Sequence, residues 1–256
     1  MTAQLTLSGS PWRRLAVVGD SIAEGVREPL DGYRDLSWID RIAEPLRAAV
    51  PELEVLNLGR RNLLAREVLA SQLDAALAFR PDLAIVAAGG NDALRRSFAP
   101  EVLERELDVM VGSLAGAGAD VVMLELMDIV ASGLVPHEFA GPLDERMRAL
   151  AALTRRVARR QGAVLVEMRD HPASADPGVY ASDRLHLNAR GHAIVADEAV
   201  RALSAALAAR AGLRVEITEE EILSDLSWPG PPPGEWRVPQ RSARRAGARG
   251  MSRVVR

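Results

Sequence analysis

Five short runs of apolar residues alternate along the chain with longer segments of mixed character. In chain order the runs are Leu15–Val18, Val55–Leu58, Leu83–Ala88, Val121–Leu126 and Val164–Met168. A short continuous apolar run is typical of a strand that is buried on both faces, as strands of parallel sheets are. The pattern therefore predicts five parallel strands.

The longer segments carry apolar residues at every third or fourth position, which is the period of a helix with one buried face. They are Ser37–Ala49, Leu63–Phe79, Pro100–Ala115, Leu143–Gln161 and Asn188–Ala211. Strands that alternate with helices predict an α/β doubly wound sheet, with right-handed crossovers that place helices on both faces. Active sites in such folds lie at the carboxyl ends of the strands.

This pattern stops near Leu213. Residues 213–256 are first acidic, then rich in proline, and finally rich in arginine with few apolar residues. Such a segment buries too little apolar surface to offset its ordering entropy. We therefore expect one domain over residues 1–212 and a Pro/Arg-rich, flexible tail over residues 213–256. The alternatives are a short docked helix around "EILSDLSW" and a basic arm that contacts a partner or nucleic acid.

Composition narrows the class of protein. The 256 residues carry a formal net charge of −3, and the body of the chain has no basic footprint for nucleic acid or for an anionic membrane. No apolar run approaches the roughly 20 residues that a membrane span needs, and the N-terminus lacks the pattern of a signal peptide. We expect a cytoplasmic protein whose partner is a small molecule. The sequence does not indicate an oligomeric state.

Two residue types are missing, and their absence limits the possible chemistry. The chain has no cysteine, and all 32 of its basic residues are arginine. Thiolate nucleophiles, cysteine metal sites, lysine Schiff bases and lysine-dependent phosphate loops are therefore excluded. No G-x-G-x-x-G follows the first apolar run, which argues against a nucleotide-binding protein. We expect no cofactor.

Three polar motifs fall at the predicted carboxyl ends of strands. Gly-Asp-Ser, ending at Ser21, follows the first strand, and Gly-Gly-Asn-Asp, which contains Asn91, follows the third. Asp183 and His186 lie between the fifth strand and the last helix. Because these ends share one edge of a parallel sheet, we expect the four side chains to meet there.

These residue types suit nucleophilic catalysis. A serine hydroxyl becomes a good nucleophile when a neighbouring base accepts its proton, and His186 is suited to that role. Asp183 can fix the tautomer of the imidazole. The amide of Asn91 and the backbone N–H of Ser21 can stabilise the oxyanion that forms. The other histidines are interpreted as loop residues (His137 and His171) and as a helix-packing residue (His192).

Four stretches resemble the conserved blocks of the SGNH (GDSL-type) hydrolases: "AVVGDSIAEG", "NLGRRNLL", "IVAAGGNDAL" and "DRLHLNARGH". The resemblance covers about Leu15 to Ala211. It implies a flavodoxin-like three-layer α/β/α sandwich, and hydrolysis of esters or thioesters through an acyl-enzyme without a metal. It also implies that Ser21 is the nucleophile, His186 the base, Asp183 the carboxylate that orients it, and Asn91 an oxyanion donor.

The second block departs from the family pattern. The family has a glycine five residues after the block's asparagine, and its backbone N–H completes the oxyanion hole. Counting from Asn57 leads to Asn62, and the glycine present is Gly59. Only a backbone donor is required, and asparagine tolerates left-handed backbone geometry. Asn62 is therefore the predicted donor, with Gly59 as the alternative.

The resulting hypothesis is a serine esterase that hydrolyses a small acyl ester or thioester. The alternative is a catalytically idle member of the same fold that binds a ligand. The loops Arg27–Leu36 and Asp128–Gly141 are expected to wall the pocket, and their mixed composition does not indicate which ester is hydrolysed.

Overall fold

The predicted strands assemble into one five-stranded parallel sheet. The structure is a computed structural model, and it describes residue 7 and residues 9–211. The strand order is β3-β1-β4-β5-β6. The bounds are Arg14–Gly19 for β1, Glu54–Asn57 for β3, Leu83–Ala87 for β4, Asp120–Leu124 for β5 and Val164–Val166 for β6. This is the order of flavodoxin-like sheets, with its switch point between β1 and β4.

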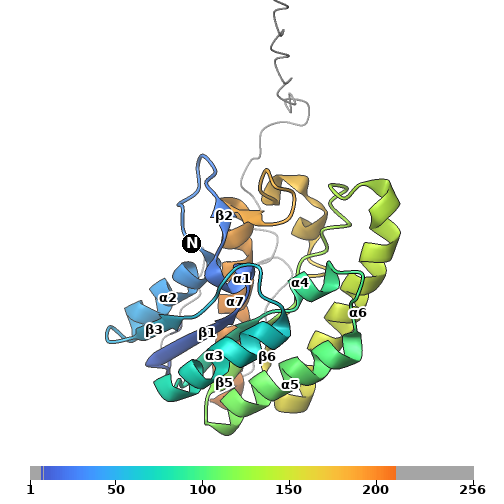
Figure 1. Ribbon diagram of the computed structural model, residues 1–256. Helices are drawn as coiled ribbons and strands as arrows, with labels where there is room; N and C mark the ends of the chain where they lie inside the picture. The colour runs from blue at the N-terminus through green and yellow to red at the C-terminus, as the bar shows by residue number, and fades with distance from the viewer. Residues whose placement is uncertain (1–6, 8, 212–256) are drawn as a thin grey trace, which may run out of the picture. The chain divides into compact units, whose positions relative to one another are not determined.

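Helices cover both faces of the sheet (Figure 1). Their bounds are Trp38–Ala49 for α2, Ala65–Phe79 for α3, Pro100–Gly116 for α5, His137–Gln161 for α6 and Ala189–Arg210 for α7. Helices α2 and α7 pack together on one face, and α5 packs between α3 and α6 on the other. The predicted three-layer α/β/α sandwich is confirmed.

The central strands explain why the apolar runs are continuous. Every residue of Leu15–Val18 on β1 and of Leu83–Ala87 on β4 is buried. Both faces of these strands lie under helices, so no position along them is left for a polar side chain. Among the described residues, no helix is both long enough and apolar enough to cross a bilayer. The predicted tail, residues 213–256, lies outside the described residues, and the domain boundary stays a prediction.

Helix α6 differs from its predicted extent. The sequence predicts a start at Leu143, whereas the helix begins at His137 and contains Pro142. Proline lacks an N–H, so the carbonyl of Glu138 loses its partner one turn earlier. Glu138 is exposed, so water can satisfy that carbonyl, and the extra turns form in spite of the proline.

Short elements follow the strands at the carboxyl-end rim, and the sequence pattern did not reveal them. They are α1 (Ser21–Glu24), β2 (Arg27–Glu28), α4 (Gly90–Ala93), η1 (Pro172–Ala175), η2 (Pro177–Val179) and β7 (Leu187–Asn188). Elements of two to four residues are too short to show a period. Strands β2 and β7 pair in parallel as a separate two-stranded sheet. This pairing joins the segment after Ser21 to the segment after His186.

Candidate active site

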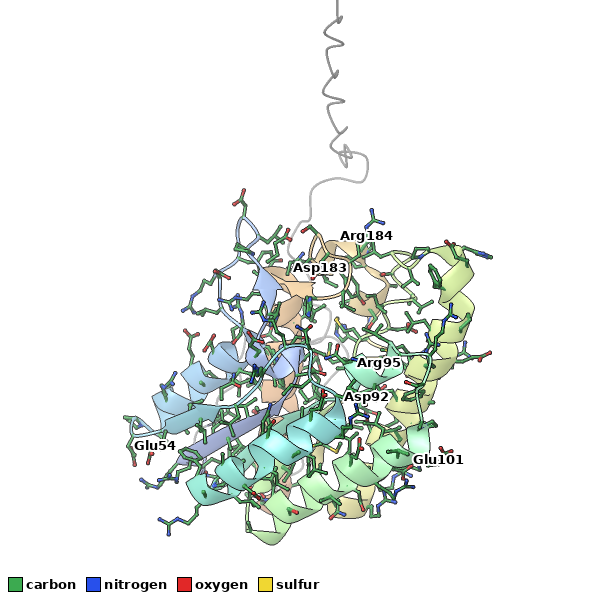
Figure 2. The ribbon with its side chains drawn as sticks, viewed as in Figure 1. Glu54, Asp92, Arg95, Glu101, Asp183 and Arg184 are labelled. Carbon is green, nitrogen blue, oxygen red and sulfur yellow. The ribbon has the colours of Figure 1, made fainter. Side chains whose placement is uncertain are left out.

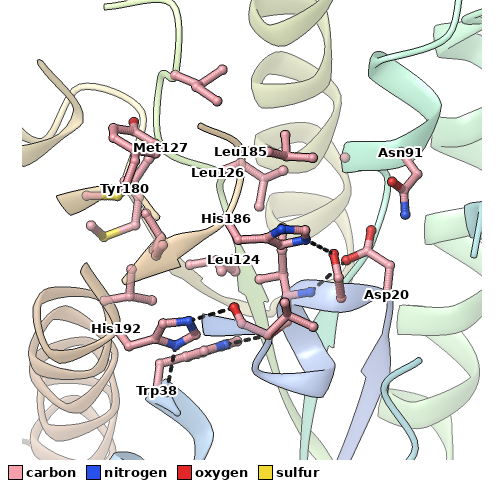
Figure 3. Close-up of a pocket in the computed structure, with 18 of the residues that line it drawn as sticks. Asp20, Trp38, Asn91, Leu124, Leu126, Met127, Tyr180, Leu185, His186 and His192 are labelled. Atoms are coloured by element: carbon pink, nitrogen blue, oxygen red, sulfur yellow. Dashed lines mark hydrogen bonds between the residues drawn. The ribbon is translucent and has the colours of Figure 1, made fainter. Parts of the chain in front are cut away.

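Ser21, His186 and Asp183 form one hydrogen-bonded chain at the rim. His186 Nε2 lies 2.9 Å from Ser21 Oγ, and His186 Nδ1 lies 2.6 Å from Asp183 Oδ2. A carboxylate only accepts hydrogen bonds, so Nδ1 carries the ring proton and Nε2 accepts from the serine hydroxyl. The ring is therefore held in the tautomer that can remove the proton from Ser21. Figure 3 shows the ring of His186 in the pocket, near the carboxyl group of Asp20.

A tight turn holds Asp183 beside His186. Asp183 Oδ1 accepts from the backbone N–H groups of Leu185 and His186, each at 3.0 Å. Arg184, in the middle of the turn, has φ = 59°, in the left-handed region. Figure 2 shows Asp183 and Arg184 side by side on this outer turn. Burial opposes the charged form of Asp183, but the hydrogen bonds from His186 and the two backbone groups outweigh it and hold the pKa of Asp183 below its ordinary value.

Ser21 is placed by the sharp turn that links β1 to α1. Ser21 is the first residue of α1 and is 7% exposed. Gly19, two residues earlier, has φ = 150°, and a Cβ there would lie 1.9 Å from the carbonyl oxygen of Ala87. Only glycine allows β1 and β4 to lie this close where the chain turns.

A buried glutamine holds the end of β1. Strand β3 ends at Asn57, opposite Val17, so Gly19 has no strand partner on that side. The side chain of Gln72 on α3 replaces it: Gly19 N–H donates to Gln72 Oε1 at 2.8 Å, and Gln72 Nε2 donates to Gly19 O at 2.9 Å. Gln72 is 4% exposed. The sequence analysis missed this residue, because a glutamine within a helical pattern gives no sign that it is buried.

Two hydrogen-bond donors lie beside the serine hydroxyl. The backbone N–H of Ser21 opens α1 and meets no acceptor among the described residues. Asn91, on α4, donates from Nδ2 to the carbonyl of Leu63 at 3.0 Å, which leaves its second N–H available. Both residues line the pocket. The structure thus places Asn91 and Ser21 in one pocket, as the sequence predicts.

The loop after β3 separates the two candidates for the second-block donor. Gly59 N–H already donates to Asn57 Oδ1 at 2.8 Å, and a Cβ on Gly59 would lie 2.3 Å from the backbone nitrogen of Glu24. Gly59 therefore serves close packing against α1. Asn62 has φ = 69°, and its N–H has no acceptor among the described residues. The free N–H and the positive φ favour Asn62 over Gly59 as the donor. Asn62 itself is not one of the residues that line the pocket.

The Asn62 loop is fixed on both sides. The backbone N–H of Arg60 donates to Gly19 O at 3.2 Å, and that of Arg61 donates to Glu24 Oε2 at 2.6 Å. On the other side, Asn91 holds the carbonyl of Leu63. These bonds tie the loop to the end of β1, to α1 and to α4, the three elements that form this side of the site.

A pocket of about 100 Å³ opens next to Ser21 and His186. Its wall is mainly apolar, and its apolar members include Ile22, Trp38, Leu124, Leu126, Met127, Ile129, Met147, Met168, Leu187 and Val195. The predicted wall is only partly correct. No residue of Arg27–Leu36 lines the pocket, and the flanking Val26 and Trp38 line it instead. From Asp128–Gly141 only Ile129 contributes.

The structure gives the other histidines structural positions, and it corrects the interpretation of His137 as a loop residue, because His137 is the first residue of α6. His192 Nδ1 accepts from the backbone N–H of Trp38 at 3.0 Å, and its Nε2 donates to the carbonyl of Val26 at 3.1 Å. Burial lowers the pKa of His192 to about 4, so the ring is neutral and fixes the start of α2. His171 caps η1, and His137 is exposed at the start of α6.

Asp20 is a second residue that the sequence analysis passed over. It is 1% exposed and caps α1, where its Oδ1 accepts from the N–H of Ile22 at 3.0 Å. Burial, reinforced by the nearby carboxylate of Asp92, raises the pKa of Asp20 to about 7. Its position before the nucleophile was visible in the sequence, but its burial was not. Within residues 7 and 9–211, no cluster of His, Asp and Glu side chains could hold a metal ion.

Known proteins resemble this chain in sequence and in fold. A profile of the GDSL-like lipase/acylhydrolase family matches residues 17–194. An arylesterase from Vibrio mimicus is 30% identical over 127 residues, which cover 48% of this chain and 58% of the relative. The chain thus aligns with less than two thirds of that relative's length.

Solved structures share the fold. TesA superposes with a TM-score of 0.60 at 25% identity, covering 74% of this chain and 97% of TesA. An acetylxylan esterase from Geobacillus stearothermophilus, Axe2, gives a TM-score of 0.61 at 20% identity, with 78% and 96% covered. LAE5, an α/β hydrolase from the metagenome of Lake Arreo, gives 0.61 at 24%, with 78% and 98% covered. The family profile spans more than half of the sequence and all of the sheet from within β1 to β6, and this protein belongs to the GDSL-like lipase/acylhydrolase family.

Proposed function

We propose that this protein is a serine esterase that hydrolyses small acyl esters or thioesters through an acyl-enzyme. The observation that carries the proposal is the position of His186, whose two ring nitrogens lie 2.9 Å from Ser21 Oγ and 2.6 Å from Asp183 Oδ2. Family membership and the arylesterase relative support the same reaction class.

Acylation follows from this geometry. His186 Nε2 removes the proton from Ser21 Oγ as the oxygen attacks the acyl carbon, and Asp183 stabilises the imidazolium that forms. The carbonyl oxygen becomes an alkoxide, which accepts hydrogen bonds from the N–H of Ser21, the amide of Asn91 and the N–H of Asn62. His186 then returns the proton to the leaving alcohol or thiol, and the acyl group remains on Ser21.

Deacylation uses the same groups with water as the nucleophile. His186 removes a proton from water, the hydroxide attacks the acyl carbon, and the proton returns to Ser21 Oγ as the carboxylic acid leaves. Each step balances with the ester and water alone, so the reaction requires no cofactor.

The pocket supports a short acyl group. Benzene, with six carbon atoms, occupies an engineered protein cavity of about 150 Å³. In proportion, the pocket of about 100 Å³ accommodates roughly four carbons beyond the carbonyl. Its mainly apolar wall favours an alkyl chain over a sugar or a charged group. We therefore propose butanoyl to hexanoyl esters as the preferred substrates.

A panel of p-nitrophenyl esters graded by acyl length tests both parts of the proposal. The expected result is hydrolysis with a maximum of kcat/KM near four to six carbons, and no activity in Ser21→Ala, whose melting temperature stays close to that of the wild type. Wild-type activity that persists in Ser21→Ala would overturn the nucleophile assignment. A flat profile across the panel would overturn the acyl preference. A folded wild-type protein that binds these esters without hydrolysing them would be a binding protein of the same fold.

A further inference from the structure

The carboxyl group of Asp20 lies inside the active site but takes no part in the reaction as described so far. Asp20 lines the pocket together with Ser21, Gly90, Asn91 and His186. In Figure 3 its side chain lies between His186 and Asn91. Ser21 and Asn91, which line the same pocket, are the proposed donors to the oxyanion.

The two oxygens of this carboxyl group have different surroundings. Oδ1 accepts from the N–H of Ile22 at 3.0 Å and so caps α1. Oδ2 is buried and has no hydrogen-bond partner among the described residues. A Cβ built on Gly90 would lie 3.8 Å from Oδ2, which places this oxygen against the loop that presents Asn91.

The charged groups around Asp20 disfavour its ionised form. Two titratable side chains face it: Asp92 from α4 and His186 from the loop before β7. Asp92 is itself partly buried, and its Oδ2 accepts from the N–H of Ala65. None of the arginine contacts seen in the described residues reaches Asp20. Burial is the largest effect and Asp92 adds to it, so the pKa of Asp20 rises to about 7, while His186 opposes the rise.

We propose that Asp20 acts in the reaction as a neutral carboxylic acid, and that its ionisation switches hydrolysis off. The proposal rests on the esterase function proposed above. A protonated Oδ2 carries an O–H that finds no acceptor among the described residues. Because Oδ2 lies against the loop that presents Asn91, we assign the substrate's carbonyl oxygen as its acceptor in the complex. Asp20 would then be a further catalytic residue, one that donates to the developing alkoxide.

The same geometry makes the ionised form inhibitory. An ionised Asp20 has no O–H to donate. It would also place a negative charge beside the negative oxygen of the tetrahedral intermediate. A buried carboxylic acid kept neutral by an apolar site is known to serve as an oxyanion donor in ketosteroid isomerase. Activity should therefore decline as Asp20 loses its proton, above about pH 7.

The test compares the pH dependence of kcat/KM for p-nitrophenyl butanoate in the wild type and in Asp20→Asn. Asparagine caps α1 equally well, and its amide is a neutral donor that cannot ionise. The wild-type value should fall about tenfold per pH unit above about pH 7, and this limb should be missing in the variant. The ratio of variant to wild type should therefore rise with pH, whatever its value at pH 6. A ratio that stays flat or falls would overturn the proposal.

A second measurement does not depend on turnover. The side-chain carboxyl carbon of Asp20 can be titrated by NMR in Ser21→Ala, with Asp20→Asn used to assign the signal. The expected midpoint is about 7, moving to lower pH in Asp92→Asn because a like charge is removed. A midpoint near 4 would overturn the proposal. The activity of Ser21→Ala tests the proposed esterase function, and the NMR midpoint tests the protonation of Asp20. A failure of one proposal is therefore distinguished from a failure of the other.

Discussion

Gln72 forms two hydrogen bonds with the backbone of Gly19, two residues before the nucleophile. The amide of Gln72 takes the place that a strand would occupy if β3 continued past Asn57. The position of Ser21 thus depends on a side chain from α3, because the sheet alone leaves the end of β1 half paired.

Gln72→Leu should destabilise the protein by about 2 kcal/mol, since it leaves the buried N–H of Gly19 without an acceptor. It should also lower kcat several-fold, because the turn that carries Ser21 becomes less fixed. Urea unfolding and ester hydrolysis measure the two effects. Ser71→Ala is the matched control, because the hydroxyl of Ser71 donates to the carbonyl of Glu67 within α3 and makes no other hydrogen bond to the described residues. Equal behaviour of the two variants would contradict this role for Gln72.

Asp183→Asn should lower kcat less than His186→Ala does. The asparagine variant keeps a base, but its amide favours the wrong tautomer of the imidazole. His186→Ala should match Ser21→Ala, because the members of a triad act as a unit. Single-turnover kinetics with a nitrophenyl ester ranks the three variants. His192→Ala serves as a comparison that changes a structural histidine, and loss of activity there with retention in His186→Ala would reverse the assignment of the base.

The predicted oxyanion donor of the second loop is tested at Asn62. Asn62→Gly should keep most of kcat, because glycine adopts a positive φ and keeps the N–H. Asn62→Pro should lose about a hundredfold or more, since proline removes the donor and fixes φ near −65°. A thermal melt must show that the proline variant is folded.

If folded Asn62→Pro keeps the wild-type kcat, then Asn62 is not a donor. A variant at Gly59 cannot decide between the two residues, as any side chain there would meet the backbone of α1. Loss of activity in such a variant would reflect a steric clash with α1 and would not identify the oxyanion donor.

Asp20→Asn should also stabilise the fold, and by more at pH 8 than at pH 4. The pKa of Asp20 rises from 3.8 in the unfolded chain to about 7 in the fold, so the folded protein loses stability as the pH rises through this window. Removing the charge should raise the free energy of unfolding by up to about 4 kcal/mol above pH 7, because each pKa unit corresponds to about 1.36 kcal/mol. Urea unfolding at the two pH values measures the difference.

Asp183→Asn is the control of opposite sign. The pKa of Asp183 is lowered, so its small contribution to stability is present at neutral pH and is lost as the pH falls. A stability gain from Asp20→Asn that does not change with pH would show that Asp20 titrates near its ordinary value.

The sequence predicted the sheet, the main helices and the meeting of Ser21, Asp183, His186 and Asn91 at one rim. These features depend on apolar periodicity and on the rule that parallel strands end at a common edge, and both can be seen in a single sequence. The short rim elements, the early start of α6 and the loop that leaves the pocket wall could not be predicted. They depend on contacts between distant segments, such as the pairing of β2 with β7.

The burial of single polar residues also could not be predicted from the sequence. Gln72 and Asp20 are both buried at the site. Glutamine and aspartate are usually exposed, so their residue types alone do not predict this burial. The choice between Asn62 and Gly59 likewise required coordinates, because it rests on which backbone N–H already has a partner.

The hydrogen bond between Ser21 and His186 joins residues 165 positions apart, and the pairing of β2 with β7 spans a similar length. We expect contacts of such high sequence separation to form after the local helices and neighbouring strands, because closing a long loop costs more entropy. A refolding chain could therefore regain its circular dichroism before it regains hydrolysis. The rate at which ester hydrolysis recovers would then measure how fast these long-range contacts form.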